Sequence, residues 1–392
     1  MTERSAPLSD VTVIDLTRVL AGPYLTMMLA DMGARVIKVE IPGSGDDARH
    51  FGPFLEGESA YFATINRGKE SISLNLKDKD DRKILEKLML KADVLVENFR
   101  AGAMDRLGYD WDTVHRINPA LIYAAVSGFG HTGPYSDRPA YDLVVQGMGG
   151  IMSLTGSGDD DPRPVRVGTS VGDITAGMFG LSGVLAALYD REKTGKGVKV
   201  DVGMLDCQVA ILENAVSRYF TENVIPGPIG IRHPSITPFA GLRAAGGEYL
   251  ILAAGNDAMF AHLCKIIDRP ELSEDPRFLT NPDRTSNFAE LHVELEKRLA
   301  DKPAAQWLDI LGEAGIPCGP INNIEQVVND PQVAARNMIV SATSETGAIF
   351  RMPGNPVKLS AYDDPATRKA APRQDQDRDA ILAWLEQEPD IE

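Results

Sequence analysis

The first 40 residues alternate between strand-like and helix-like patterns, and this alternation constrains the fold more than any other feature of the chain. A β-branched run, Val11–Leu16, leads into the turn Ala21–Pro23. Residues Tyr24–Asp31 place apolar side chains at helical spacing before Gly33, and Arg35–Glu40 reads as a second strand. A strand, a helix and a strand within about 30 residues predict a βαβ unit with parallel strands and a right-handed crossover.

The same alternation recurs along the chain. The expected elements are a helix over 79–91, a strand over 93–97, a helix over 111–117 and a strand over 121–126. After a Gly-rich stretch come an apolar helix over 174–189, a strand over 198–202 and a helix over 204–219. Repeated units of this kind predict an α/β fold with a large Rossmann-like domain built on a doubly wound sheet.

A Pro- and Gly-rich segment, 225–238, marks a domain boundary. We expect 1–200 to form the N-terminal part of the large domain and 201–224 to be a connecting helix and linker. A smaller α+β domain is expected over 225–320. Residues 321–392 are expected to return to the large domain and to end in an amphipathic helix over 380–386.

Composition excludes several classes of partner. The chain carries 40 basic and 56 acidic residues, a net charge of −16, whereas nucleic acids and anionic membranes require a basic surface. The three cysteines, Cys207, Cys264 and Cys318, are widely spaced, so neither a disulfide framework nor a metal site is expected. The apolar stretch 174–189 is short for a membrane span, and the first ten residues lack the apolar core of a signal peptide. We therefore expect a soluble, cytoplasmic protein.

Several familiar catalytic and cofactor motifs are missing or imperfect. The segment 43–48, GSGDDA, fits a dinucleotide fingerprint by spacing, but two acidic residues stand where phosphates would approach. The six histidines form no zinc-binding pair of the HExxH kind, and no GxSxG elbow is present. A nicotinamide-dependent oxidoreductase, a zinc hydrolase and a serine hydrolase are therefore disfavoured.

One carboxylate stands out as a candidate nucleophile. Asp173 lies where a Gly-containing approach, 164–172, meets the apolar helix. At that junction it is expected to cap the helix, and the backbone N–H groups and helix dipole would keep it ionised. An ionised carboxylate there is able to form an acyl anhydride. A purely structural cap is the alternative reading.

Positive residues follow several predicted strands, where parallel sheets bind ligands. Phe99 could lie against the base of a nucleotide, and the cations near it could pair with phosphates. The alternative is that each is a solvated surface charge. The cations are Lys77, Arg100, Arg106 and Arg138.

Long segments of the sequence resemble the class III coenzyme A-transferases of the formyl-CoA transferase group. The match is collinear over nearly the whole chain. It rests on VTVIDLTRVLAGPYLTMMLADMGARVIKVE, GSGDDARHFGP, NRGKESISLNLK, ADVLVENFRAGAMDRLGYDW, SGFGHTGPYSDRPAYDLVVQGMGGIMSLTG, VGTSVGDITAGMFG, TGKGVKVDVGMLD and GIPCGPINNIEQVVNDPQ.

The resemblance implies roles for particular residues. Asp173 matches the family's catalytic aspartate, and Tyr141 with Asp142 would orient the acyl group. Coenzyme A (CoA) is implied as a substrate, with no permanently bound cofactor and no metal, and the family implies an intertwined, interlocked-ring homodimer. The positions implied to line the CoA site are Leu20, Ala21, Leu74, Asn75, Leu76, Lys77, Asn98, Phe99, Arg100, Arg106 and Arg138.

The chain also departs from the family pattern. Ile41 stands where some members have an Arg, and 375–377 reads Asp-Gln-Asp instead of Gly-Glu-His. The segment 233–238 replaces the glycine-rich loop of formyl-CoA transferases. These departures disfavour formyl-CoA and oxalate as substrates. A small dicarboxylate acceptor with succinyl-CoA or a similar donor is the preferred hypothesis.

Candidate partners for a distal substrate carboxylate are Arg49, Arg67, Arg232 and His233.

Two other readings remain open. The α-methylacyl-CoA racemases share the fold and use an Asp and a His, but the matching place here reads Ala140-Tyr141-Asp142. Un-ionised Tyr is a poor base at neutral pH, although His131 lies nearby in the sequence. A non-catalytic CoA-binding protein is the second alternative.

Overall fold

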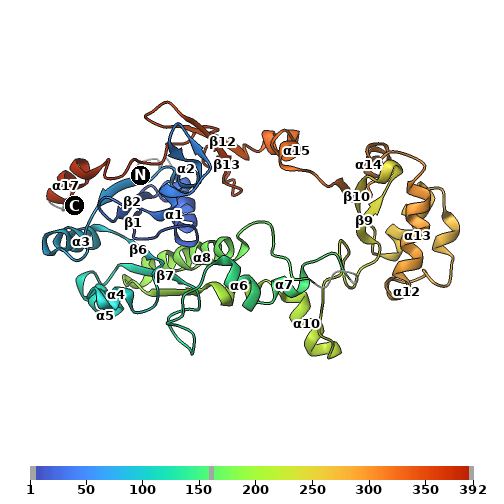
Figure 1. Cartoon of the computed structure of the whole chain (residues 1–392), viewed down its shortest axis with the longest axis horizontal. Coiled ribbons are helices and arrows are strands. Elements are labelled where there is room, and N and C mark those ends of the chain that lie inside the picture. The colour runs from blue at the N-terminus through green and yellow to red at the C-terminus, as the bar shows by residue number, and fades with distance from the viewer. Residues whose placement is uncertain (1–5, 159–162, 388–392) are drawn as a thin grey trace. The chain divides into compact units, whose positions relative to one another are not determined.

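The computed structural model describes residues 6–158 and 163–387, and its internal contacts divide the chain into two compact units. Unit 1 comprises the chain up to Met152, Arg166–Val224 and the chain from Pro331 onward. Unit 2 comprises Ser153–Val165 and Ile225–Asp330, coloured mostly yellow and orange in Figure 1. Unit 1 is therefore built from three separate stretches of sequence.

A parallel six-stranded sheet forms the centre of unit 1, in the order β5-β2-β1-β6-β7-β8. Counted along the chain within this sheet, the order is 3-2-1-4-5-6, the doubly wound arrangement, so the prediction of a parallel α/β sheet is confirmed. The order reverses between β1 and β6, which makes their carboxyl ends the topological switch point. The strands are β1 (Thr12–Asp15), β2 (Arg35–Glu40), β5 (Glu70–Ser73), β6 (Val94–Glu97), β7 (Ile122–Ser127) and β8 (Lys199–Gly203).

Helices cover both faces of this sheet, because successive side chains of each strand point to opposite faces. Val13 packs with α1 (Ala21–Asp31) and α8 (Val171–Thr194) in one buried cluster. Ile14 packs in a second cluster on the other face. The helices of that second face are α3 (Lys79–Lys91), α5 (Trp111–Ile117) and α17 (Arg378–Glu386).

The predicted helix boundaries are partly wrong. The first helix begins at Ala21 rather than Tyr24, because Pro23 is tolerated in a first turn, where its missing N–H has no intrahelical partner. Helix α8 is longer than predicted and ends where Gly195 adopts φ 66°. The single helix predicted over 204–219 is two, α9 (Met204–Ala210) and α10 (Glu213–Glu222), because Leu212 leaves the helical region with ψ 35°.

Smaller elements complete unit 1. The hairpin of β12 (Ile339–Thr343) and β13 (Ile349–Pro353) packs on α2 (Ala60–Asn66) through buried apolar side chains. The remaining elements are β3 (Phe54–Leu55), β4 (Glu58–Ser59), the 3-10 turn Asp47–His50, α4 (Ala103–Arg106), α6 (Asp142–Met148), α7 (Ile151–Leu154), which runs into unit 2, and α16 (Pro331–Ala335).

Unit 2 holds an antiparallel sheet of three strands in the order β11-β10-β9, covered by helices around the buried side chains of Trp307, Phe260 and Phe278. An antiparallel sheet with helices of its own is an α+β arrangement. Its elements are β9 (Phe239–Arg243), β10 (Tyr249–Ala253), β11 (Cys318–Pro320), α11 (Asp257–Ile266), α12 (Asn281–Ser286), α13 (Phe288–Leu299), α14 (Ala304–Glu313), α15 (Ile324–Val328) and the 3-10 turns Ala245–Gly247 and Pro270–Ser273.

The edge strand β5 is covered by the last part of the chain. The Asp375 and Asp377 carboxylates accept hydrogen bonds from the Ser73 and Ser71 N–H groups, at 2.6 and 2.8 Å. Arg378 donates to the Ser73 carbonyl at 2.8 Å. Strand edges expose unpaired backbone groups that invite further strands, and these contacts occupy them.

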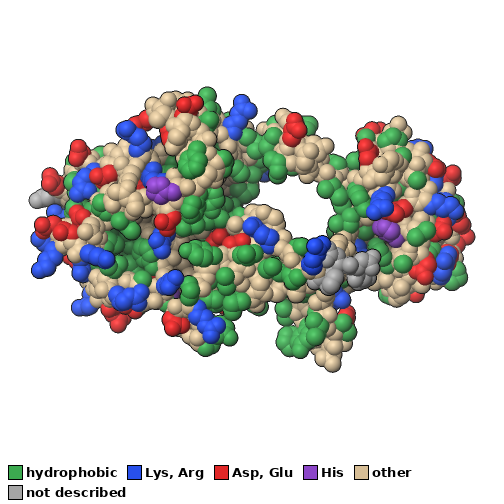
Figure 2. Space-filling model, viewed as in Figure 1, with side chains coloured by type: hydrophobic (Ala, Val, Ile, Leu, Met, Phe, Trp, Pro, Cys, Tyr) green, Lys and Arg blue, Asp and Glu red, His purple; other side chains and the backbone are tan. Residues whose placement is uncertain are grey.

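Helix α8 is long and apolar enough to cross a membrane by length and composition alone. In unit 1 it is a core helix, because Ala176, Gly180 and Val184 along one face are buried against the sheet and α1. A different helix leaves its apolar side chains uncovered. Figure 2 shows hydrophobic side chains gathered on α10, where Tyr219 and Phe220 are exposed.

Close contact between α1 and α8 depends on Gly177. A Cβ at this position would lie 2.9 Å from the Ala21 carbonyl oxygen and 3.0 Å from the Tyr24 ring. We predict that Gly177→Ala lowers the free energy of unfolding by about 1–3 kcal/mol, because the backbone contact cannot relax. Urea unfolding measures this. The control Gly147→Ala, where the nearest atom is 3.7 Å away, should be neutral or stabilising; equal effects would contradict the argument.

Candidate active site

The segment that follows β1 at the switch point has an unusual backbone. Val19 adopts φ 68°, which is sterically unfavourable for a β-branched residue and persists only where neighbours hold it. Its N–H donates to the Asp46 carboxylate at 3.0 Å. On the other side, the Arg18 N–H donates to Asn98 Oδ1 at 2.9 Å and the Asn98 amide returns a bond to the Arg18 carbonyl at 2.7 Å. The turn is thus fixed from both β2 and β6.

Buried ion pairs lie beneath this turn. The Lys38 ammonium contacts Asp46 at 2.8 Å and donates to the Thr17 carbonyl at 2.8 Å, while Lys69 contacts Asp15 at 2.8 Å. Burial raises the pKa of Asp15, but the Lys69 and Lys38 ammonium groups outweigh it and hold that pKa well below its usual range. Asp46, within the imperfect dinucleotide fingerprint, therefore serves as an internal anion that supports the turn.

A cleft opens beside the switch point and contains half of the residues that the sequence singled out. Its volume is about 320 Å³. The predicted residues among its lining are Leu20, Ala21, Asn98, Phe99, Arg100, Arg106, Arg138, Tyr141 and Asp173. Sequence reasoning missed Arg18, Ser127 and Ser136, although Arg18 directly follows the first strand and could have been found by the rule applied to the other cations.

A second, more apolar cavity of about 340 Å³ adjoins the cleft. The two share Arg18, Phe99 and Ala103. The predicted residues Leu74, Asn75, Leu76 and Lys77 line this second cavity, together with Ile41, which is exposed. The structure thus brings the predicted CoA-site residues together around Phe99.

Asp173 lies in the first turn of α8 but does not cap it, so the prediction of an N-cap is wrong. Ser170 is the N-cap residue, without a side-chain cap bond, and within the described part of the chain no hydrogen bond to the Asp173 carboxylate is found. Burial and the neighbouring Asp142 carboxylate raise the pKa of Asp173 to about 7. The expectation that the helix start keeps it fully ionised is therefore also wrong, since desolvation and like charge outweigh the dipole.

Two side chains on α6 hold the segment that carries Asp173. The Asp142 carboxylate accepts the Gly172 N–H at 2.9 Å and a bond from the Gln146 amide at 2.8 Å. Gln146, fully buried, accepts the Val167 N–H at 2.9 Å. The sequence missed Gln146, whose only signal is its spacing of four residues from Asp142.

Tyr141 and His131 are placed very differently. The Tyr141 side chain is 69% exposed and lines the cleft with Asp173. His131 is not among the cleft residues; its ring lies between Lys199 and Glu97. A proton transfer between His131 and a ligand at Asp173 has no support in this arrangement, which disfavours the racemase reading.

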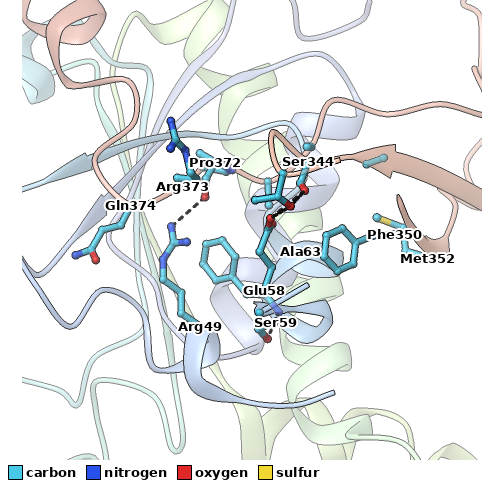
Figure 3. A pocket seen from close by; sticks show the side chains of 16 residues that line it. Arg49, Glu58, Ser59, Ala63, Ser344, Phe350, Met352, Pro372, Arg373 and Gln374 are labelled. Carbon is cyan, nitrogen blue, oxygen red and sulfur yellow. Dashed lines mark hydrogen bonds between the residues drawn. The ribbon is translucent and has the colours of Figure 1, made fainter. Parts of the chain in front are cut away.

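The four candidates for a distal substrate carboxylate are engaged elsewhere. Arg49 forms two bonds to Glu40 at 2.7 Å and lines a separate cavity, where Figure 3 shows it pointing toward the Pro372 carbonyl. Arg67 is buried and paired with Asp31 at 2.6 Å. In unit 2, the Arg232 guanidinium lies over the Phe288 ring and the His233 ring stacks on Phe239.

Among the residues that the structure describes, no group of three or more His, Cys, Asp or Glu side chains is placed to hold a metal ion. The site's chemistry is therefore argued from its carboxylate, its cations and its backbone N–H groups.

Comparison with known proteins identifies the family. The profile of CoA-transferase family III matches residues 8–378, and the chain belongs to this family. The acetyl-CoA:oxalate CoA-transferase of Acetobacter aceti is 48% identical over 96% of this chain and 95% of its own length. The succinate–glutarate CoA-transferase of Agrobacterium fabrum is 38% identical over 98% and 97%.

The solved structures agree. A CAIB/BAIF family protein from Brucella suis superposes with a TM-score of 0.84 at 38% identity, covering 98% of this chain and 100% of its own. The predictions of the family and of a CoA-transferase are confirmed.

Proposed function

We propose that the protein transfers CoA from succinyl-CoA or a similar donor to a small dicarboxylic acid, with Asp173 as the nucleophile. The observation that carries the proposal is the meeting of Asp173 with four arginines and the switch-point turn in one cleft. The arginines are Arg18, Arg100, Arg106 and Arg138. The named activities of the relatives, on oxalate and glutarate, favour dicarboxylates as acceptors.

The CoA molecule would span the two adjoining cavities. Its adenine ring would lie in the apolar cavity against Phe99, near Leu74–Lys77, and its phosphates would pair with the arginines of the cleft. The pantetheine arm would then pass the turn at Leu20 and Ala21 to bring the thioester to Asp173. This placement uses every residue predicted for the CoA site except Asn98, whose side chain binds the Arg18 backbone.

The reaction proceeds through covalent intermediates in which atoms and electrons balance. An Asp173 carboxylate oxygen attacks the thioester carbonyl carbon, the C–S bond breaks, and CoA thiolate leaves behind a mixed anhydride. The thiolate then attacks the Asp173 acyl carbon, releasing the donor acid as its carboxylate and forming an aspartyl-CoA thioester. The acceptor carboxylate attacks the carbonyl carbon of that thioester and expels CoA thiolate, which gives a second mixed anhydride. The thiolate then attacks the acceptor's acyl carbon, which releases the new acyl-CoA and the free Asp173 carboxylate. No net proton is consumed.

Each residue near Asp173 has a distinct part in this scheme. In the first turn of α8 the Val171 and Gly172 N–H groups are bonded to the Thr169 carbonyl and to Asp142, so the Asp173 N–H would be the group that stabilises the oxyanions at the acyl carbons. Asp142 and Gln146 would act as positioning residues, because their bonds hold Val167 and Gly172 in place. Tyr141 would orient the acyl group from the open side of the cleft.

We further propose an intertwined homodimer, as the family resemblance implies, and a cytoplasmic location. Support for association comes from α10, whose side chains Val216, Tyr219 and Phe220 are exposed. Phe220 is 80% exposed, an unfavourable state for an isolated aromatic ring in water.

The nucleophile is tested directly by substitution and trapping. Asp173→Ala should reduce CoA exchange at least about a thousandfold while CoA still binds, because only the attacking atom is lost. With acyl-CoA and hydroxylamine, mass spectrometry should detect a hydroxamate on the wild-type peptide that carries Asp173. The control Asp190→Asn changes an exposed carboxylate on the same helix and should react normally. Native activity in Asp173→Ala would refute the mechanism.

The charge of Asp173 should set the pH dependence of the first step. Because the carboxylate attacks and its pKa is about 7, the single-turnover rate at saturating acyl-CoA should rise with pH around neutrality. Asp142→Asn removes the like charge and should move the midpoint to lower pH, while keeping an oxygen for the Gly172 N–H. Asp190, about 25 Å along the helix, provides the matched control Asp190→Asn, which should not move it. An unchanged midpoint in Asp142→Asn would contradict the assignment.

The acceptor class is tested with a panel of acids and succinyl-CoA. Glutarate and mesaconate should each accept CoA, with at least about tenfold higher kcat/KM than monocarboxylates of equal length, because the second carboxylate adds a charged contact. Oxalate is the third acid of the panel: the departures from the family pattern disfavour it, whereas the Acetobacter aceti relative is named for it. Product acyl-CoA thioesters are separated and quantified by chromatography. Transfer to monocarboxylates alone would remove the dicarboxylate proposal while leaving the nucleophile untouched.

A further inference from the structure

A buried carboxylate lies directly behind the loop of the proposed CoA site. Glu97 ends β6 and is 1% exposed. Its Oε2 accepts the Phe99 N–H at 2.7 Å, and its Oε1 accepts the Tyr123 hydroxyl from β7 at 3.1 Å. The carboxylate therefore ties the loop 98–100, which lines both cavities, to the interior of the sheet.

A cation on β8, Lys199, and a histidine in the segment after β7, His131, lie near the same carboxylate. The Lys199 ammonium lies 3.0 Å from His131 Nδ1. Because an ammonium group only donates hydrogen bonds, Nδ1 accepts and the ring proton sits on Nε2. That nitrogen lies 3.5 Å from Glu97 Oε1, is buried, and forms no hydrogen bond within the described structure. The Asp201 carboxylate on β8 fixes this segment by accepting the backbone N–H of His131 at 3.0 Å.

The steps proposed for CoA transfer use none of Glu97, Tyr123, His131 and Lys199, and none of them lines the cleft or the adjoining cavity. Burying ionisable groups destabilises a fold unless they are well paired, so the presence of these four groups calls for a functional explanation. The bond from the Phe99 N–H to Glu97 links these groups to the loop that lines both cavities.

We propose that Glu97 is a positioning residue for coenzyme A: its carboxylate holds the loop 98–100 in the binding conformation, and Lys199 acts on it through His131. This inference rests on the proposed function, which places CoA against Phe99 and Arg100. It adds a residue that acts on CoA affinity without touching the ligand.

The protonation of Glu97 then becomes part of CoA binding. Burial raises the pKa of Glu97 to about 7, although the Phe99 and Tyr123 bonds and the Lys199 charge oppose this. Protonation puts a hydrogen on one oxygen, so one of the converging donors loses its acceptor. CoA affinity should therefore fall as the pH drops through neutrality. The titratable groups that face this cluster come from four places: Tyr123 on β7, His131 in the segment after β7, Lys199 and Asp201 on β8, and Asp105 on α4.

The first test measures the Kd of coenzyme A by calorimetry between pH 6.0 and 8.5. In the wild type the Kd should rise about tenfold toward low pH, the effect of one charge-assisted hydrogen bond. Glu97→Gln keeps a carbonyl oxygen for the Phe99 N–H but cannot ionise, so its Kd should not depend on pH in this way. The titration is repeated with dephospho-CoA, which lacks the 3′-phosphate, because that phosphate itself titrates near pH 6 and would overlap with the titration of Glu97.

A second pair of variants tests the role of the cation. Lys199→Met should move the pH midpoint of the Kd upward, because the charge that favours the Glu97 carboxylate is lost, while kcat at saturating substrate stays near native. A purely structural role would change stability but not that midpoint. Lys87→Met, an exposed position on α3, is the matched control and should leave the midpoint unchanged.

Arg100→Ala separates failure of the inference from failure of the proposed function. If Arg100→Ala leaves the Kd of CoA unchanged, the CoA placement is wrong and the inference falls with it. If Arg100→Ala weakens binding while Glu97→Gln retains the wild-type pH dependence, the inference alone is overturned. The inference is likewise overturned if Lys199→Met leaves the pH midpoint of the Kd unchanged.

Discussion

The cleft depends on two lysines buried beneath the carboxyl end of the sheet. Lys38 and Lys69 lie among Asp15, Asp46 and backbone carbonyls, and removing one partner from such a pair typically costs about 3–5 kcal/mol. Through Asp46 the Lys38 charge reaches the N–H of Val19, whose backbone would otherwise leave the left-handed region. The shape of the ligand-facing turn is thus set by charges that the ligand never meets, and the turn is ready before any ligand arrives.

Carboxyl groups in this protein serve opposite purposes according to what surrounds them. Asp15 is paired with ammonium groups and remains charged when fully buried. Asp173 and Glu97 have raised pKa values near neutrality, because burial is not fully compensated. A group that is easily protonated can change state during a reaction cycle, whereas a tightly paired one cannot. The easily protonated carboxyl groups lie in the cleft or next to it, and the tightly paired one lies beneath the turn that shapes it.

Much of the fold could be read from the sequence because its signals are local. The helices predicted over 79–91 and 111–117 have these bounds in the structure, where the Asp78 and Asp110 side chains accept N–H groups of the first turns. The parallel sheet follows from the repeated strand–helix units, and the family from long collinear motifs. Phe99 and the cations of the cleft were found because strand ends in such a sheet converge on one edge, whereas Leu20 and Ala21 came from the family resemblance alone.

The misses have more than one cause. The charge state of Asp173 depends on Asp142, 173 − 142 = 31 positions earlier, and on burial that no local pattern reveals. Arg49 looked free for a ligand, but Glu40 on the neighbouring strand neutralises it. The break between α9 and α10 also escaped, since Ile211 and Leu212 fit a continuous apolar helix equally well.

The covering of β5 has a consequence for synthesis. Asp375 and Asp377, which occupy the outer edge of this strand, lie 302 and 306 residues beyond the serines that they bind, so they leave the ribosome long after it. During that interval the nascent sheet keeps an open edge, and the growing chain is exposed to pairing with a neighbour.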